Sequence, residues 1–425
     1  MKSLFRAGMA RNLALTFLSF GFLAASGIVI NLFVVVARDS ASLGVFNQAY
    51  SVYIVASQIA VFGLQYSTMR SAAFHENDRA ELGRVLSGAA FPALLFGLAA
   101  AILVFLSEPL FAGLLGSPQA GAAVAIAGLG LVFFPLSKVL ISFINGVQHM
   151  AAFAILQALR YSLVAGFAVG VAFSDLAFEY ALYCFLVAEL VTTVAAALYI
   201  VFGGLCDMRQ FGLARVREHL AFGARSLAVG IFGEINTRID VLMLGVFLDD
   251  RAVGIYSFAA LFLDGVSHAL AMVRVNFNPF LVGALRDNAI DRARALLRKT
   301  KVRAPAAMFG ISVLALAAFL AFAHLILPEK DLAGGVTSLI ILLTSITLVS
   351  GFMPFDNIML ASGRPGYQTF QQMAAVGANI AGNLALIPLF GIEGAALGTA
   401  FGFVAGTALQ IALTYRFLGW NMLRS

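Results

Sequence analysis

Apolar stretches of twenty residues or more recur from one end of this 425-residue sequence to the other. Each is long enough to cross a hydrocarbon core of about 30 Å as an α-helix. Hydrophobic residues make up 61% of the chain and charged residues only 11%, whereas charged residues are about 25% of a soluble domain. Lipid must therefore be the solvent for most of the chain, and the sequence predicts an all-α polytopic membrane protein.

Twelve apolar windows lie between charged or Pro/Gly-containing breaks, and each predicts one transmembrane helix. They cover residues 12–36, 44–69, 85–107, 120–145, 151–173, 177–203, 222–247, 254–283, 305–327, 335–361, 367–389 and 394–418. The first window follows Lys2, Arg6 and Arg11 and so resembles the start of a signal peptide. It lacks a small-residue cleavage site and exceeds a signal-peptide core in length, so we interpret it as a spanning helix.

The charge of the connections orients these helices. With both termini placed inside, nineteen Lys and Arg residues of the connections and termini lie inside, and Arg38, Arg251 and Lys330 lie outside. Cytoplasmic loops of membrane proteins carry such an excess of Lys and Arg. The sequence therefore predicts that both termini are cytoplasmic, and the regular alternation supports the helix count.

Two inner connections are longer than the others. In residues 204–221, apolar residues alternate with Arg209, Arg215 and Arg217, which is typical of a helix lying in the membrane interface. Residues 284–304 include the run DRARALLRKTKVR, with six basic residues and one Asp. Both connections fit an anchor on an anionic inner leaflet, and contact with the phosphate of a substrate is the alternative.

A weak internal repeat divides the chain into two halves of six helices. Residues 44–46 (GVF) correspond to residues 254–256 (GIY), and Pro135 corresponds to Pro354. Two copies with an even number of crossings have the same orientation and are related by an axis along the membrane normal. We expect an N-terminal lobe (1–205), a connecting amphipathic segment (206–221) and a C-terminal lobe (222–425), with a site between the lobes.

Several ionisable residues lie inside the predicted helices. A charged side chain in a bilayer costs at least about 2.5–3.5 kcal/mol of free energy, so each needs a partner, water or a ligand. They are Lys138, Arg160, Glu189, Glu234, Arg238, Asp240, Asp264, His268, Arg274 and Asp356, with Arg225 near a helix end. Basic and acidic residues are equal in number, so there is no excess of negative charge to select an organic cation. An anionic substrate such as a diphosphate would offset the Arg and Lys residues.

Several of these residues have a second, purely structural interpretation. Glu234 and Arg238 share a helix face, and Arg160 and Glu189 lie at similar depth in consecutive helices, so either pair could simply neutralise itself. Lys138 and Arg274 lie nearer the inner end and could extend to the surface.

The pair Asp264 and His268 also allows two interpretations. The two residues share a helix face and lie near the middle of the membrane. Either side chain could change protonation during transport, or the pair could only pack its helix.

Signatures of enzymes are absent from the sequence. It has no Gly-rich phosphate loop, no HExxH, no Gly-x-Ser-x-Gly and no Cys cluster, and its five histidines are scattered. We therefore expect no catalytic residues, no metal site and no cofactor. The pI near 9.5 is accounted for by inner-leaflet charge, and no nucleic-acid partner is expected.

The stretch GEINTRIDVLMLGVFLDDRAVGIYSFAALF (residues 233–262) has an intramembrane Arg-x-Asp before a short acidic turn and Val-Gly-Ile-Tyr-Ser. With the related LGVFNQAYSVYIVASQIAVFGL of the first half, it resembles the polysaccharide-transport family of oligosaccharide flippases. These are relatives of the O-antigen (Wzx-type) flippases in the MOP superfamily, which also contains the MATE exporters and the lipid II flippase. Twelve helices rather than fourteen argue against the lipid II flippase itself.

This resemblance implies two six-helix lobes around a central cavity that opens alternately to each side of a bacterial inner membrane. The substrate would be an undecaprenyl-diphosphate-linked oligosaccharide for polysaccharide, O-antigen or lipopolysaccharide synthesis, and polysaccharide assembly enzymes would be partners. The resemblance implies that Arg238 and Asp240 belong to the site. We also expect Arg274, Lys138 and Arg160 to bind the substrate, on the argument from charge alone.

Asp240, Glu234, Asp264, His268 and Glu189 are then expected to couple transport to H⁺ or Na⁺ or to act as charge partners. The main alternative function is a MATE-like exporter of cations coupled to an ion gradient. A non-transporting scaffold for a polysaccharide assembly complex is the alternative of a different class.

Overall fold

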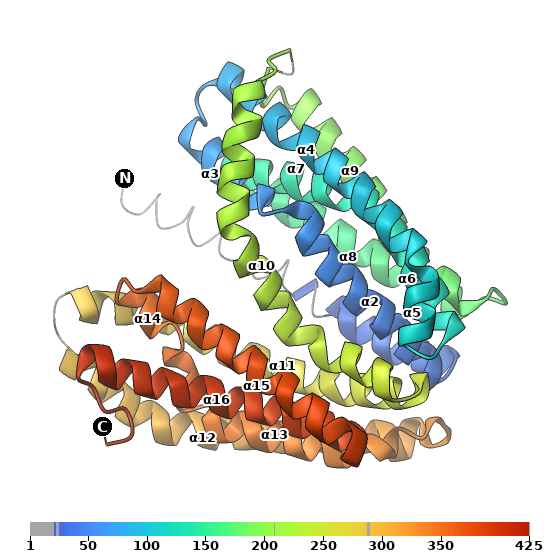
Figure 1. The fold of residues 1–425 in the computed structure, drawn as a ribbon, viewed down its shortest axis with the longest axis vertical. Coiled ribbons are helices and arrows are strands. Elements are labelled where there is room, and N and C mark those ends of the chain that lie inside the picture. Colours follow the sequence, from blue (N-terminus) through green and yellow to red (C-terminus); the bar gives the residue numbers. More distant parts are fainter. Residues whose placement is uncertain (1–20, 23–24, 208, 287–289, 425) are drawn as a thin grey trace. The chain divides into compact units, whose positions relative to one another are not determined.

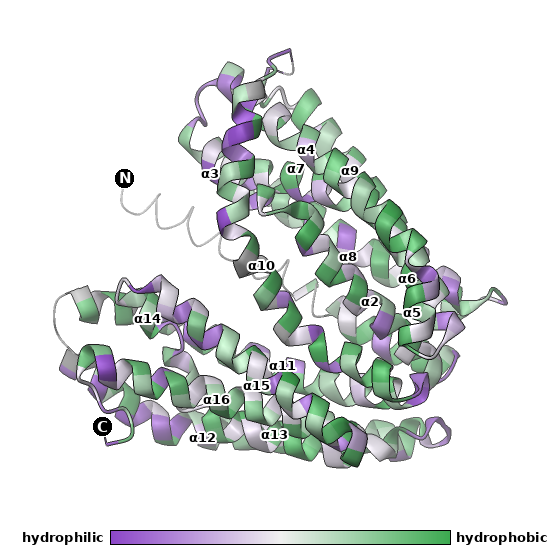
Figure 2. Ribbon diagram, viewed as in Figure 1, coloured by the Kyte–Doolittle hydropathy of each residue, from purple (hydrophilic) through white to green (hydrophobic). Residues whose placement is uncertain are grey.

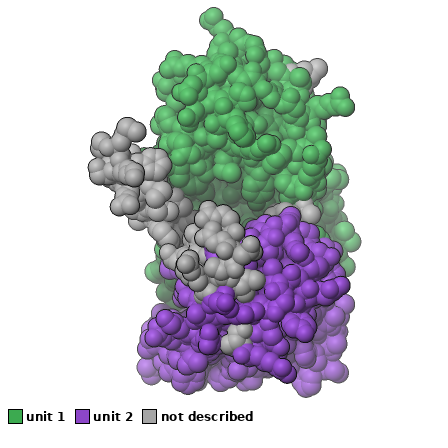
Figure 3. Space-filling model, turned by 90° about the vertical axis from the view of Figure 1, so that its left-hand side faces the viewer, with its two compact units in different colours: residues 1–234 green, residues 235–425 purple. Residues whose placement is uncertain are grey.

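The computed structural model describes residues 21–22, 25–207, 209–286 and 290–424, and every element in this part of the chain is a helix. Contacts between residues divide the chain into two compact units, unit 1 (residues 1–234) and unit 2 (residues 235–425), which Figure 3 colours separately. Apolar residues dominate the helices of each unit, and hydrophilic residues gather at helix ends (Figure 2).

Unit 1 begins, in its described part, with an apolar helix over Ala25–Ala37. It continues with α2 (Ser40–Val61), α3 (Leu64–Phe74), α4 (Arg79–Leu106), α5 (Glu108–Leu114), α6 (Pro118–Gly128), η1 (Leu129–Val132), α7 (Phe134–Gly146), α8 (Met150–Ala172), η2 (Phe178–Leu182) and α9 (Tyr183–Phe202). Helix α10 (Leu213–Phe247) passes from unit 1 into unit 2 (Figure 1).

Unit 2 continues with long helices joined by short helical turns. They are α11 (Asp250–Arg286), α12 (Ile290–Ala321), η3 (Phe322–Ile326), η4 (Pro328–Lys330), η5 (Leu332–Gly335), α13 (Val336–Val349), η6 (Met353–Phe355), α14 (Ile358–Ala361), α15 (Pro365–Phe390) and α16 (Ile392–Leu418). Helices α15 and α16 pack closely, because a Cβ atom on Gly382 would lie 2.8 Å from the Cα of Gly398.

The prediction of an all-α polytopic membrane fold is confirmed. Eight described helices are long and apolar enough to span a membrane, and ten spans result if the bent pairs α2–α3 and α6–α7 each count as one. With Ala25–Ala37 and the more polar α10, these segments account for all twelve predicted windows. Residues 12–20, the start of the first window, and Lys2, Arg6 and Arg11 lie outside the described residues.

Two helix starts and one short helix differ from the sequence prediction. Helix α10 already begins at Leu213 and α12 at Ile290, so much of both long inner connections is helical. No proline or glycine interrupts the basic run of α12, and the ion pair between Arg294 and Asp291 (3.0 Å) links successive turns. Helix α5 was not predicted, because its seven residues are too short to show a period.

The first turns of α10 contact α3 and α4 through His219. His219 is buried, its Nδ1 lies 2.8 Å from Ser67 Oγ, and its Nε2 lies 3.1 Å from the carbonyl oxygen of Val85. Because a carbonyl oxygen can only accept, Nε2 carries the proton and Nδ1 accepts from the Ser67 hydroxyl. Burial lowers the pKa of His219 to about 4, so the ring is neutral at pH 7 and this contact is insensitive to physiological pH.

The C-terminal segment closes one end of unit 2. Trp420 and Met422 are buried in a cluster with Phe355, and the rings of Phe355 and Trp420 meet edge to face at 6.1 Å. Lys301 Nζ donates to the carbonyl oxygen of Leu423 at 2.8 Å, which ties this segment to α12.

Trp420→Ala is therefore expected to lower the stability of the protein by about 3–5 kcal/mol, because it leaves a cavity in this cluster. Thermal unfolding of the detergent-solubilised protein measures the change. The matched control is Leu423→Ala, since that side chain is exposed and the backbone contact to Lys301 remains. Equal effects of the two substitutions would contradict the packing role of Trp420.

Candidate functional site

A buried ion pair lies inside unit 1. Arg160 on α8 donates from Nε to Oε1 of Glu189 on α9 at 2.5 Å, and the two residues are only 7% and 0% exposed. The hydroxyl of Tyr53 on α2 lies 3.5 Å from the same carboxylate oxygen. The structure thus has the neutralising pair that was one of the two interpretations of these residues, and a contact of Arg160 with substrate stays a prediction.

Aromatic rings surround this pair. The ring centroid of Phe134 lies 5.0 Å from the guanidinium carbon of Arg160 and 5.3 Å from Nζ of Lys138, within the range of cation–π attraction. Tyr53 stacks on Phe185 at 4.3 Å. The bent helix pair α6–α7 carries both Phe134 and Lys138, which places the ring and the two cations together.

Lys138 differs from Arg160 in its partners. In the part of the chain that the structure describes, no carboxylate lies within ion-pair distance of Lys138. Glu189 and Glu234 act on it only through longer-range attraction, and Oε2 of Glu189 is buried without a hydrogen bond. Lys138 is therefore a half-buried cation without a carboxylate at ion-pair distance in the described part of the chain.

Asp240 on α10 is the centre of a polar cluster in unit 2. Its Oδ2 accepts from the Thr399 hydroxyl at 2.6 Å and from the Tyr256 hydroxyl at 3.2 Å, and its Oδ1 accepts from the amide of Asn383 at 2.8 Å. Three helices other than α10 supply these donors, namely α11, α15 and α16. The carboxylate is thus held in one position by groups from four helices.

Further oxygen atoms lie beside this carboxylate. Asn379 accepts from Asn383 at 2.7 Å, and Oδ1 of Asn383 is buried without a hydrogen bond. A Cβ atom on Gly398 would overlap the side chain of Asn383, so the absence of a side chain there lets α16 approach. Carboxylate, amide and hydroxyl oxygens are the ligands of hard cations, and a carboxylate in such a place can also take a proton.

Arg238, Asp264 and His268 lie near Asp240. The charges of Arg238, His268 and Asp240 all act on the Asp264 carboxylate, which places these groups in one electrostatic cluster. The His268 ring contacts the backbone carbonyl of Asp264 through Nδ1 at 2.6 Å rather than its carboxylate. The His268 and Asp264 side chains are both exposed within unit 2.

Arg274 and Glu234 have other charged neighbours than Asp264. Arg274 on α11 forms an ion pair with Asp356, between η6 and α14, with an N–O distance of 2.7 Å. Glu234 belongs to unit 1, where its charge acts on Lys138. Unit 1 therefore brings together Lys138, Arg160, Glu189 and Glu234, and unit 2 brings together Arg238, Asp240, Asp264 and His268. A shared cavity between the predicted lobes stays a prediction.

Sequence reasoning missed the uncharged partners of Asp240. Asn379 and Asn383 are four residues apart on one face of the apolar helix α15, and both are buried. Two amides at this spacing inside a spanning helix need partners, and that signal could have drawn attention to them.

The chain is similar to one protein family in sequence and to several solved structures in fold. The sequence model of the family described as "Polysaccharide biosynthesis protein" matches residues 10–276, and no curated protein matches. Among solved structures, an inward-facing MATE-family multidrug transporter of the MOP superfamily has a TM-score of 0.74 and 15% identity, covering 95% of this chain and 96% of that one.

Two other solved structures have the same fold. The lipid II flippase MurJ in an inward closed conformation has a TM-score of 0.71 and 15% identity over 97% of this chain and 89% of its own. A MOP-superfamily transporter from Pyrococcus furiosus has a TM-score of 0.60 and 13% identity over 97% and 95%. At these identities the structures establish a common fold, and function must be argued from the family and the residues.

Proposed function

We propose, from the premise that this chain belongs to the polysaccharide biosynthesis protein family, that it moves a lipid-linked oligosaccharide across a bacterial inner membrane. The carried species would be an oligosaccharide on undecaprenyl diphosphate, used for polysaccharide or O-antigen synthesis. Transport would occur by alternating access of two lobes, residues 1–205 and 222–425, with both termini cytoplasmic. The sugars would pass through a hydrated cavity while the prenyl chain stays in lipid.

The observation that carries this proposal is the cation Lys138. Arg160 and Arg274 each have a carboxylate at ion-pair distance, whereas Lys138 has none in the described part of the chain. A diphosphate would supply a negatively charged partner for Lys138. An organic cation would be repelled by the positive charge of Lys138. Arg238, on the resembling segment, is the second residue proposed to bind the diphosphate.

The Asp240 cluster is proposed to couple transport to an ion gradient. Its carboxylate and neighbouring oxygens suit either H⁺ or Na⁺, and α10 carries both Asp240 and Arg238. Binding of a cation at Asp240 would therefore be felt two residues away at the proposed diphosphate site.

Complementation of cells that lack their own oligosaccharide flippase tests this function. Wild type is expected to restore surface glycan, and Lys138→Met and Arg238→Ala to lower it about tenfold or more, because each loses a charged contact worth about 1.5–3 kcal/mol. Arg416→Met, at an exposed residue in the last turn of α16, is the control and should keep wild-type activity. Membrane insertion of every variant is checked by immunoblot.

Two outcomes of the complementation experiment would contradict the proposal. If wild type never reduces the pool of glycan on the inner face but lowers the retention of a cationic dye, the exporter function replaces the flippase function. If wild type restores glycan and Lys138→Met does so equally well, the diphosphate site does not include Lys138.

A further inference from the structure

Helices α2 and α3 are separated by a strained break in the backbone. Phe62 has φ of 53° and Gly63 has φ of 69°, and the two helices meet at 48°. A bulky residue such as Phe rarely adopts this left-handed conformation, which costs about 1–3 kcal/mol. The surrounding structure must therefore hold Phe62 in place.

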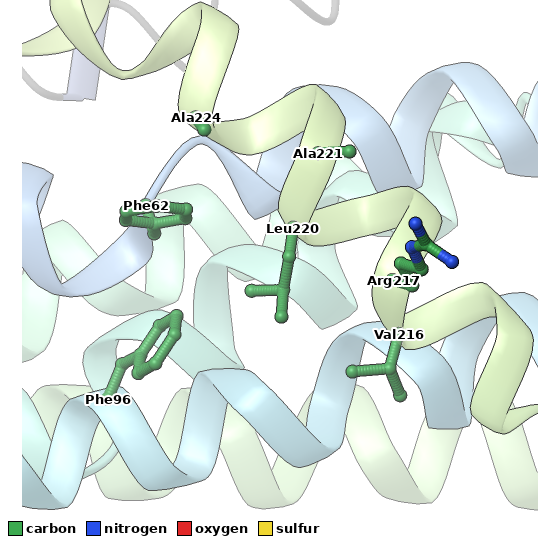
Figure 4. A pocket seen from close by; sticks show the side chains of 7 residues that line it. All are labelled: Phe62, Phe96, Val216, Arg217, Leu220, Ala221 and Ala224. Atoms are coloured by element: carbon green, nitrogen blue, oxygen red, sulfur yellow. The ribbon is translucent and has the colours of Figure 1, made fainter.

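Helix α10 lies directly against this break. A Cβ atom on Gly63 would come within 2.8 Å of the carbonyl oxygen of Gly223, so the backbones of the two segments touch. The ring of Phe62 meets Phe96 of α4 edge to face at 5.4 Å. An open groove lies between α10 and α4, beside the contact of Gly63 with Gly223 and the rings of Phe62 and Phe96 (Figure 4).

The groove has the size of a ligand site and an apolar lining. Its volume is about 620 Å³, within the range of about 300–1,000 Å³ of small-molecule sites. Figure 4 shows its lining, which consists of Phe62, Phe96, Val216, Leu220, Ala221 and Ala224, together with the single charged residue Arg217. An apolar groove of this kind favours a hydrocarbon chain over water.

Arg217 marks one end of this groove. It is exposed, and no carboxylate in the described part of the chain pairs with it. Ala224 lies about 10 Å further along α10, given a rise of about 1.5 Å per residue. Toward the Ala224 end, the guanidinium of Arg70 lies 5.5 Å from the ring centroid of Phe222, but Arg70 does not line the groove. The groove thus has one polar cationic end and an apolar body.

We propose that this groove binds an anionic phospholipid of the surrounding bilayer, with an acyl chain along the apolar lining and the phosphate at Arg217. Two observations select this occupant. The apolar body matches a hydrocarbon chain, and the single guanidinium matches the single charge of a phosphodiester, whereas a polyprenyl diphosphate carries more negative charge. Basic residues at this surface also attract anionic lipids. The proposal does not depend on what the chain transports.

Native mass spectrometry of the full-length protein, released from nanodiscs of equal phosphatidylglycerol and phosphatidylcholine, tests the site. Wild type is expected to retain phosphatidylglycerol, and Arg217→Gln to reduce the retained amount about fivefold or more. Arg209→Gln is the matched control, because it removes an exposed charge just before α10 that does not line the groove.

A second pair of variants fills the groove. Ala224→Trp, at an exposed lining residue, is expected to abolish retention, whereas Ala214→Trp, exposed on the same helix but outside the groove, is expected to leave it unchanged. Thermal unfolding verifies that each variant is folded.

Four results would overturn the proposal. They are equal losses for Arg217→Gln and Arg209→Gln, unchanged retention in Ala224→Trp, preferential retention of a polyprenyl phosphate when it is added to the same nanodiscs, and no retained phospholipid on wild type. The last result is expected if another part of the chain fills the groove.

Discussion

Arg160→Met is expected to lower the stability of the protein by about 3–5 kcal/mol. The substitution leaves the Glu189 carboxylate buried in unit 1 without its cation, and an uncompensated buried charge is more costly than the pair is favourable. Tyr53 cannot compensate, because its hydroxyl is neutral and lies 3.5 Å from Oε1. Thermal unfolding in detergent and the fraction of monodisperse protein after solubilisation measure the effect.

A double variant separates the role of the pair from the loss of one side chain. Arg160→Met combined with Glu189→Leu removes both charges and is expected to recover most of the stability, since apolar replacements of buried pairs are often neutral. If the double variant is no more stable than Arg160→Met, the pair is not the source of the effect. If Arg160→Met is as stable as wild type but fails in complementation, Arg160 acts on the substrate instead.

The same pair shows what could be predicted from the sequence. Arg160 and Glu189 lie in consecutive predicted helices, and a rise of about 1.5 Å per residue placed both near mid-depth, so a contact between them was one expectation. Depth does not give rotation about the helix axis. The sequence therefore could not decide whether Arg160 faces Glu189 or a cavity, and packing of α8 on α9 decides it.

Contacts between distant segments were beyond sequence reasoning. Asp240 and Asn383 are separated by 143 positions, and Arg274 and Asp356 by 82, so no spacing rule connects them. Asn379, Asn383 and Thr399 each stand within an otherwise apolar helix, and hydropathy alone does not connect them. Their common role depends on how α10, α15 and α16 pack.

Helix ends were predicted less well than helices, for a physical reason. The apolar windows mark where lipid requires a helix, but α10 and α12 extend well beyond them on the basic side. Water and headgroups permit a helix to continue where its residues favour it, and Arg, Lys, Leu and Ala do so in the run RARALLRKTKVR. A hydropathy window therefore sets the minimum length of such a helix.

Asp240→Asn is expected to remove the dependence of transport on an ion gradient. The amide has nearly the shape of the carboxylate and can still bond with Thr399 and Asn383, so the fold should persist. It carries no charge to attract a cation and cannot exchange a proton near neutral pH. Coupling free energies of about 1–3 kcal/mol predict a change of about 5- to 150-fold in gradient-driven transport.

Proteoliposomes with imposed proton or sodium gradients measure this dependence, with lipid-linked glycan as the substrate. Asp331→Asn is the matched control, because Asp331 is an exposed carboxylate that pairs with Arg251 outside the Asp240 cluster. A loss of transport at zero gradient, together with a lower unfolding temperature, would assign Asp240 a structural role only. Retention of full gradient dependence in Asp240→Asn would place the coupling elsewhere, and Asp264 would then be the next carboxylate to test, because it lies within electrostatic reach of Arg238.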